Sequence, residues 1–123
     1  GPPGHDTIQN HLNCLRKHDY FKCVVHRKIA GGCIIKKHPN HYELYGLYLS
    51  GNFIGKGIGS KFLRCVMQRY PVGSIWVLET PDYSTRSHRF YERNGFVFSK
   101  KSEPDPDLGY GFIEYKKVGQ PVS

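Results

Sequence analysis

Apolar and polar residues alternate along much of the chain, and this alternation predicts β-strands joined by short turns. Every second residue is apolar from 21 to 25, and a second apolar segment spans 33–35. The sequence Ala30-Gly31-Gly32 between them is a turn signal, so we expect a hairpin with its turn at 30–32. After another turn at 38–41, a third and central strand is predicted over 42–49.

Three segments have the spacing of helices instead. Asp6 or Thr7 can cap a first helix to about His18, with three apolar residues on one face: Ile8, Leu12 and Leu15. A second helix is predicted from about Gly57 to Tyr70, where apolar residues recur four positions apart. A third runs from Ser84 to Arg93 and is expected to end in a left-handed cap at Asn94-Gly95.

Three further strands complete the predicted elements, over 75–78, 96–98 and 110–117, with an exposed loop over 103–108. The predicted element order is α-β-β-β-α-β-α-β-β. It predicts an α/β (α+β) fold, in which a mixed, mainly antiparallel, twisted sheet is flanked by helices.

The length of 123 residues fits one domain, which we expect over 5–118, with a tag remnant or leader at 1–4 and a tail at 119–123. No apolar run approaches membrane-spanning length and no signal peptide is evident, which favours the cytoplasm and no membrane partner. Four cysteines without a CxxC pair fit reduced, buried thiols in that compartment.

The net charge of +8 favours anionic partners such as phosphorylated cofactors, nucleic acid or acidic lipid. The basic residues are scattered in short groups, so the sequence is compatible with RNA binding without favouring it. His38 and His41 have a metal-ligand spacing, but a lone pair lacks the remaining ligands of a zinc site. We therefore expect no bound metal.

The turn over 55–60 carries the strongest chemical signal. Gly55, Gly57 and Gly59 alternate where a strand leads into a helix, so several backbone N–H groups can point at one anion. The helix N-terminus adds attraction for phosphate, and Lys56, Lys61 and Arg64 add charge.

Two common phosphate motifs are excluded by spacing. A P-loop needs G-x-x-x-x-G-K-[ST], whereas Gly51 precedes Gly55 by one residue too few. The dinucleotide fingerprint G-x-G-x-x-G also differs from the G-x-G-x-G found here. Read alone, the turn could still be no more than a tight strand-to-helix connection.

The turn gains a specific interpretation from its surroundings. Leu47-Tyr48-Leu49, the segment 54–59 and the segment 84–96 together resemble the GNAT superfamily of N-acetyltransferases. In that family a strand leads into (R/Q)-x-x-G-x-(G/A), and a later helix carries N-x-x-A-x-x-F-Y before Gly-Phe. The resemblance covers about Tyr42 to Lys117, and it implies a GNAT-like fold with a shortened N-terminal part and acetyl-CoA as cosubstrate.

The resemblance also implies which residues hold the cofactor. They belong to the strand, the turn and the later helix: Leu47, Leu49, Ile54, Gly55, Lys56, Gly57, Ile58, Gly59, Ser60, Ser84, Ser87 and Phe90. Ile54 stands where the family has Arg or Gln, so backbone amides are expected to hold the pyrophosphate. Ser84 replaces the usual Asn and Ser87 the usual Ala.

The same resemblance assigns catalytic roles in a direct attack of an amine on the thioester. The Leu49 N–H would polarise the acetyl carbonyl, and Tyr91 would protonate the departing thiolate. Glu43 is the candidate base and Glu79 the reserve base. The alternatives are a core tyrosine at 91 and an exposed carboxylate at 43.

The expected function is therefore transfer of an acetyl group from acetyl-CoA to a primary amine of a small molecule or peptide. Two alternatives remain open: a non-catalytic acetyl-CoA-binding sensor, and an acetyltransferase acting on RNA-linked amines such as aminoacyl-tRNA. The sequence leaves the chain as a monomer or a homodimer.

Overall fold

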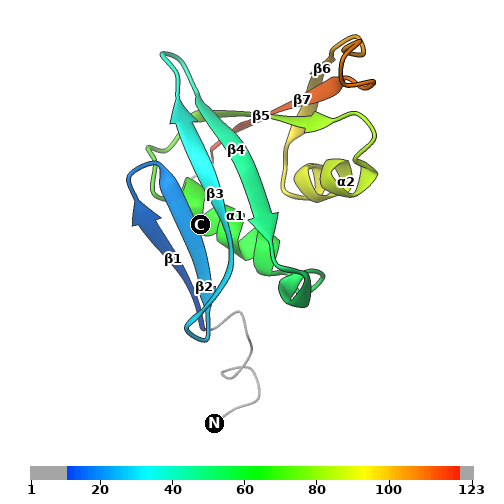
Figure 1. The fold of residues 1–123 in the computed structure, drawn as a ribbon. Helices are drawn as coiled ribbons and strands as arrows, with labels where there is room; N and C mark the ends of the chain where they lie inside the picture. Colours follow the sequence, from blue (N-terminus) through cyan, green and yellow to red (C-terminus); the bar gives the residue numbers. More distant parts are fainter. Residues whose placement is uncertain (1–10, 120–123) are drawn as a thin grey trace. The chain divides into compact units, whose positions relative to one another are not determined.

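The computed structural model describes residues 11–119, which form seven strands, two α-helices and a short 3-10 helix (Figure 1). In chain order these are β1 (Leu12–Lys17), β2 (Tyr20–Val25), β3 (Lys28–Lys37), β4 (Tyr42–Leu49), η3 (Gly51–Phe53), α1 (Ile58–Met67), β5 (Ile75–Pro81), α2 (Thr85–Arg93), β6 (Val97–Lys101) and β7 (Phe112–Val118). Neither described helix is long and apolar enough to cross a membrane.

The strands pair in the order β1-β2-β3-β4-β5-β7-β6. The pairs β1–β2, β2–β3, β5–β7 and β6–β7 are antiparallel. Strands β4 and β5 are parallel, with Tyr42 opposite Trp76 and Glu43 opposite Val77. The predicted mixed and mainly antiparallel sheet is therefore confirmed.

The chain divides into two compact units. Among described residues, the first unit contains 11–36 and 44–71, and the second contains 37–43 and 72–119. Strand β4 contributes its first two residues to the second unit and the rest to the first. Each unit has a core of its own.

The core of the first unit lies where α1 packs against one face of the strands (Figure 1). Alternate residues of β2, namely Phe21, Cys23 and Val25, are fully buried, as their period of two predicts. Helix α1 contributes residues at helical spacing, among them Phe62 and Val66.

The core of the second unit is built around β5 and α2. Trp76, Leu78 and Tyr115 are buried on the strands, and Phe96 is buried just after the helix. The Tyr115 hydroxyl donates a hydrogen bond to Glu92 Oε2 at 2.8 Å, which ties β7 to α2. Burial, and to a smaller extent this hydrogen bond, raises the pKa of Tyr115 to about 12, so the phenol stays protonated.

The predicted N-terminal helix to His18 is wrong, because residues 12–17 form strand β1. Within it only Cys14 is buried, while Leu15 is exposed. A two-residue turn with His18 in the left-handed region returns the chain directly to β2. Antiparallel pairing with β2 thus overrides the local helical spacing. Asp6, Thr7 and Ile8 lie outside the described residues.

The hairpin between β2 and β3 is confirmed, but its predicted turn at 30–32 is wrong. The chain reverses at His26 and Arg27, which both have positive φ, of 51° and 66°. Gly31 and Gly32 lie inside β3, where their missing side chains allow close approach: Gly31 packs against the Tyr48 carbonyl oxygen and Gly32 against Tyr20.

Other predicted elements match the structure closely. Strand β4 has the predicted bounds, and α1 ends three residues before Tyr70. At the end of α2, Gly95 has φ 87°, and Phe96 N–H bonds the Tyr91 carbonyl at 3.0 Å. This is the expected left-handed cap.

We predict that the buried thiols make the fold sensitive to alkali. Burial raises the pKa of Cys23 to about 11 and that of Cys33 to about 12, from an ordinary value of 9.0. Below pH 9 both thiols are protonated in folded and unfolded chains, so their contribution to stability is complete. Above it only the unfolded chain ionises, so the free energy of unfolding falls as pH rises.

Urea unfolding under reducing conditions, from about pH 8 to about pH 10, measures this decline. Cys33→Ala is the matched variant, because it removes one of the raised pKa values while tyrosines and lysines still titrate. The free energy of unfolding of Cys33→Ala should fall less steeply with pH than that of the wild-type chain. Equal slopes would contradict the prediction.

Candidate active site

The glycine turn lies in the first unit and leads directly into α1. Gly55 and Gly57 have φ of 81° and 75°, a left-handed conformation that other residues adopt only with strain. Gly57 is the N-cap of α1 and supplies no side-chain cap. The first turn of the helix contains no acidic residue, so no carboxylate of this turn would repel an anion at the helix start.

Burial changes abruptly at the start of α1. Gly55, Lys56 and Gly57 are exposed, whereas Ile58 is 0% exposed. A Cβ built on Gly55 would meet no atom within 4 Å, so the space beside the turn is open. Glycine is therefore needed here for its backbone conformation, and the open space can admit a ligand.

The other predicted cofactor residues of this unit flank the turn. Leu47 and Leu49 are half-buried near the end of β4, which the Ser50 N–H anchors to the Ala30 carbonyl at 2.7 Å. Ile54 is 39% exposed with extended backbone, and its N–H bonds Gly51 O at 3.3 Å. These predicted residues, 47, 49 and 54–60, all belong to the first unit and run from the end of β4 to the start of α1.

The remaining predicted cofactor residues lie in the second unit, at the N-cap of α2 and on the helix itself. The Ser84 hydroxyl donates to Ser87 Oγ at 2.9 Å, so Ser84 bonds its neighbour and makes no side-chain cap bond to the helix. Phe90 is half-buried. Helix α2 therefore presents Ser84, Ser87 and Phe90 one turn apart, at positions i, i+3 and i+6.

Tyr91 is buried, with 8% of its surface exposed. Its ring makes edge-to-face contacts with Phe90 and Phe96, at centroid distances of 5.1 and 5.6 Å. These contacts fix the ring on one side of α2. The geometry is compatible with the core role and with the acid role, which both stay open.

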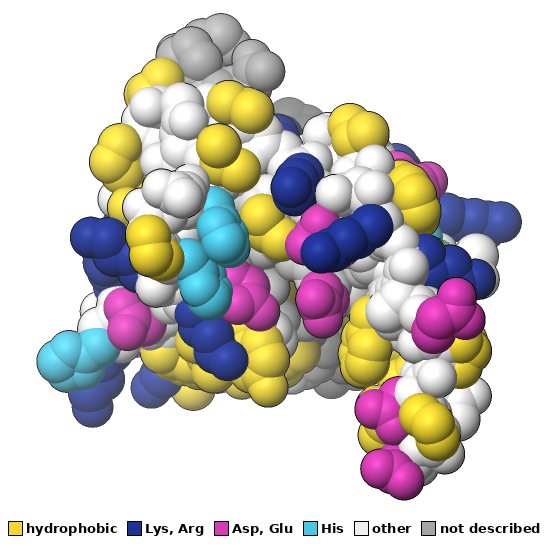
Figure 2. Space-filling model, turned by 90° about the horizontal axis from the view of Figure 1, so that it is seen from above, with side chains coloured by type: hydrophobic (Ala, Val, Ile, Leu, Met, Phe, Trp, Pro, Cys, Tyr) yellow, Lys and Arg dark blue, Asp and Glu magenta, His cyan; other side chains and the backbone are white. Residues whose placement is uncertain are grey.

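Glu43 has a partner that the sequence analysis missed. Its Oε1 lies 2.8 Å from His38 Nε2, and both side chains are partly exposed. His38 also stacks on His41, with ring centroids 4.5 Å apart. Figure 2 looks down on this end of the β3–β4 hairpin, where histidine and acidic side chains lie side by side.

The available signal for this pair was the proline turn at 39–40, which folds the chain back so that residue 38 meets residue 43. The spacing of His38 and His41 by itself points only to a metal site. The observed bond of His38 to a carboxylate instead suits a group that orients Glu43 or exchanges a proton with it.

Glu79, the reserve base, is exposed on β5. It lies opposite Glu114 of β7, which in turn lies opposite Lys100 of β6. The like charges of Glu79 and Glu114 face each other, and the neighbouring Lys100 can offset their repulsion. Glu79 therefore has a less sheltered setting than Glu43.

A family model described as the acetyltransferase (GNAT) family matches residues 2–96. No significant match was found among curated protein sequences.

Several solved structures share the fold at low identity. Ard1 from Thermoplasma volcanium has a TM-score of 0.72 at 14% identity, covering 84% of this chain and 72% of its own. The ribosomal-protein-S18-alanine N-acetyltransferase from Escherichia coli has a TM-score of 0.71 at 15% identity, with coverage of 94% and 86%. A streptothricin acetyltransferase of Bacillus anthracis, in complex with acetyl coenzyme A, has a TM-score of 0.68 at 17% identity, with coverage of 80% and 62%.

We predict that Gly95, which ends α2 and so positions Tyr91, is more sensitive to substitution than a glycine with equal backbone strain. An added Cβ at Gly95 would lie 3.2 Å from Lys117 Nζ, whose ammonium is held by the Asn94 carbonyl. Gly109 has nearly the same φ, of 82°, with open space around it.

Gly109→Ala should therefore lower the free energy of unfolding by about 1 kcal/mol, through strain alone. Gly95→Ala should lower it by about 2 kcal/mol, because the Lys117 contact is disturbed as well. Equal losses in urea unfolding would show that the Lys117 contact has no effect.

Proposed function

The chain belongs to the acetyltransferase (GNAT) family, and from that membership we propose that it transfers an acetyl group from acetyl-CoA to a primary amine. The acceptor class that we propose is an amine of a small molecule or a peptide. The four reduced thiols fit a reducing compartment such as the cytoplasm.

One observation carries the proposal: the exposed turn at 55–57 leads into a helix start that has neither an acidic residue nor a side-chain cap. Lys56 and Lys61 lie on either side of this start, and Arg64 follows one turn later. No acidic residue occurs between 44 and 71. A pyrophosphate therefore meets backbone N–H groups and positive charge, without a competing carboxylate from this segment.

The apolar side chain of Ile54 is consistent with a diphosphate that is held by backbone amides. The family usually has Arg or Gln at this position, whereas this side chain offers no polar contact. The two left-handed glycines remain, and the position of Gly55 is open. The residues present therefore fit a cofactor whose diphosphate is held by amides rather than by a side chain.

In the proposed reaction acetyl-CoA supplies a thioester that an amine attacks directly. Glu43 takes the proton of the amine, directly or through water, while His38 orients its carboxylate from 2.8 Å. The Leu49 N–H donates to the acetyl oxygen as charge develops there. Tyr91 gives its proton to the departing thiolate.

Two solved structures with the same fold suggest acceptors to test. The Escherichia coli structure is named for acetylation of an alanine of a ribosomal protein. The MccE immunity acetyltransferase, with a TM-score of 0.68 and 24% identity, was crystallised with acetyl-CoA and AMP. A peptide amine and a nucleotide-linked amine are therefore both worth including in a substrate screen.

We predict that acetyl-CoA raises the melting temperature of the wild-type chain and that Gly57→Glu abolishes this shift, because a carboxylate at the helix start repels the pyrophosphate. Gly57→Ala is the matched control, since it carries the same left-handed strain without the charge. It should keep part of the shift. The melting temperature is measured by thermal denaturation. If acetyl-CoA raises it as much in Gly57→Glu as in the wild-type chain, the cofactor binds elsewhere.

We predict that Tyr91→Phe lowers kcat by about 10²-fold or more with an unchanged acetyl-CoA shift, because only the phenolic proton is lost. Glu43→Gln should lower kcat comparably, whereas Glu79→Gln should retain it. Thiol release measures turnover over amines and peptides. An unchanged rate in Tyr91→Phe would favour the core role, and stabilisation without turnover on any amine would favour the sensor.

A further inference from the structure

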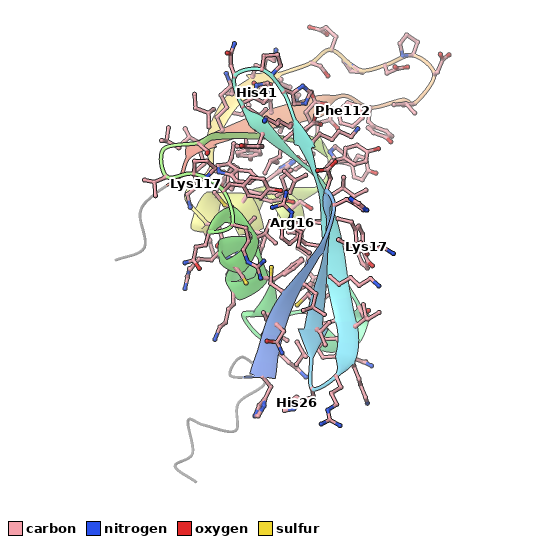
Figure 3. The ribbon with its side chains drawn as sticks, turned by 90° about the vertical axis from the view of Figure 1, so that its left-hand side faces the viewer. Arg16, Lys17, His26, His41, Phe112 and Lys117 are labelled. Carbon is pink, nitrogen blue, oxygen red and sulfur yellow. The ribbon has the colours of Figure 1, made fainter. Side chains whose placement is uncertain are left out.

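The face of the first unit opposite α1 is uncovered. Strands β1 to β4 stand in front of α1 in Figure 1, and among the described residues no helix of this unit lies on the face toward the viewer. Arg16 and Lys17 project to opposite sides of β1 in Figure 3. Arg16 lies over the buried Phe21, so Lys17 belongs to the open face.

Six residues define what we call the tyrosine face. Strand register, alternation with buried residues or a side-chain contact assigns each of them to this face: Lys17, Tyr20, Lys22, Lys36, Tyr45 and Tyr48. Tyr45 and Tyr48 are each 49% exposed. These residues come from four strands and are separated in sequence, so only the folded sheet brings them together.

Two contacts order side chains on this face. The hydroxyl oxygens of Tyr20 and Tyr48 lie 3.0 Å apart, and Lys36 Nζ lies 3.8 Å from the centre of the Tyr45 ring. Tyr45 and Tyr48 reach the same face because Gly46, with φ 67°, interrupts the alternation between them.

Tyr20 lies across the sheet rather than standing away from it. A Cβ built on Gly32 would lie 2.5 Å from the Tyr20 hydroxyl oxygen and 2.9 Å from its Cζ. Gly32 thus makes room for the end of the ring against β3. A ring laid over a strand presents its outer side to solvent as a surface for stacking.

Charge is unevenly distributed between the units. The described part of the first unit contains ten lysine and arginine residues and a single acidic residue, Asp19, which lies in the β1–β2 turn. The tyrosine face itself has three lysines and no carboxylate. It therefore offers aromatic stacking and positive charge together, over a surface wider than one phosphate.

We propose that the tyrosine face binds single-stranded RNA, with bases stacked on the tyrosines and phosphates paired with the lysines. Stacking on aromatic rings beside a cationic groove is the usual chemistry of single-strand recognition on a sheet. An acidic peptide would satisfy the lysines but leave the ring surfaces without stacked partners. This binding is separate from the proposed acyl transfer and does not depend on it.

The hydroxyl pair favours RNA over DNA. Each phenol can donate and accept, and the hydrogen bond to Tyr48 is the main cause that raises the pKa of Tyr20, which keeps its proton in place. A ribose 2′-hydroxyl can join such a pair as donor or acceptor, whereas deoxyribose cannot.

Fluorescence anisotropy with a labelled single-stranded RNA of about 12 nucleotides tests the proposal on the whole chain. Tyr45→Ala and Tyr48→Ala should each weaken binding about tenfold, because one stacking partner is lost. Tyr45→Phe keeps the ring and should bind like the wild-type chain. Tyr83→Ala removes an exposed tyrosine of the second unit and should also have no effect.

The lysines are tested through salt dependence. Replacing Lys17 and Lys22 together by Gln should reduce the slope of log affinity against log salt by roughly 1.4, whereas the matched pair Lys100→Gln and Lys101→Gln on β6 should leave it unchanged. Circular dichroism checks that every variant is folded. If an alanine variant is unfolded, the RNA affinities of Tyr45→Phe and Tyr45→Leu are compared instead, because these two side chains differ in the aromatic ring.

Several results would overturn the proposal. They are absence of RNA binding, equal losses in the tyrosine variants and Tyr83→Ala, or equal effects of the two lysine pairs. Equal affinity for DNA of the same sequence would contradict the choice of RNA. Displacement of the RNA by an acidic peptide at lower concentration would assign the face to a protein partner instead. The acetyl-CoA shift, measured on the same variants, keeps this outcome distinct from failure of the acyl-transfer proposal.

Discussion

The burial of Ile58 at the start of α1 is the constraint on which the rest of the first unit depends. Full removal of such a side chain from water stabilises the fold by about 2 kcal/mol, and Phe62 and Val66 continue the buried stripe. With Ile58 held in the core, the chain from η3 must turn within residues 54–57. Only glycine adopts the required left-handed conformations easily at 55 and 57. The exposed glycine turn is thus a consequence of the packing immediately after it.

The second unit positions its chemistry by similar means. Helix α2 is held to β7 by the Tyr115–Glu92 bond and by Lys117, whose Nζ donates to the Asn94 carbonyl at 2.6 Å. These contacts and the Gly95 cap determine where Tyr91 lies. Glu43 is held in turn by His38. The proposed acid and base therefore both depend on hydrogen bonds made by residues outside the recognised motif.

The distribution of charge links the two proposals. The glycine turn and the tyrosine face both belong to the unit with ten basic residues and one acidic residue. A cofactor diphosphate and an RNA backbone need the same positive potential, but they are bound by different groups. Amides at a helix start suit the compact diphosphate. Aromatic rings along a sheet suit a chain of bases.

Much of the fold could be predicted from local sequence, and the misses have a common cause. Strand 42–49 and the cap at Gly95 were confirmed because each depends on a few neighbouring residues. The helix expected to end at about His18 was wrong. Its apolar residues have a helical spacing, but antiparallel pairing with β2 makes residues 12–17 a strand. Glycines at 31 and 32 predicted a turn, whereas they serve close packing inside β3.

The sequence by itself determined the family motif, the glycine turn before α1 and the order of the later elements, because residues close along the chain carry those signals. Only the tertiary structure decided that His38 meets Glu43, and that Tyr20, Tyr45 and Tyr48 share one open face with three lysines. The reason is physical. Strand register and the packing of one side chain over another depend on residues far apart in sequence, and no local pattern records which of them will meet.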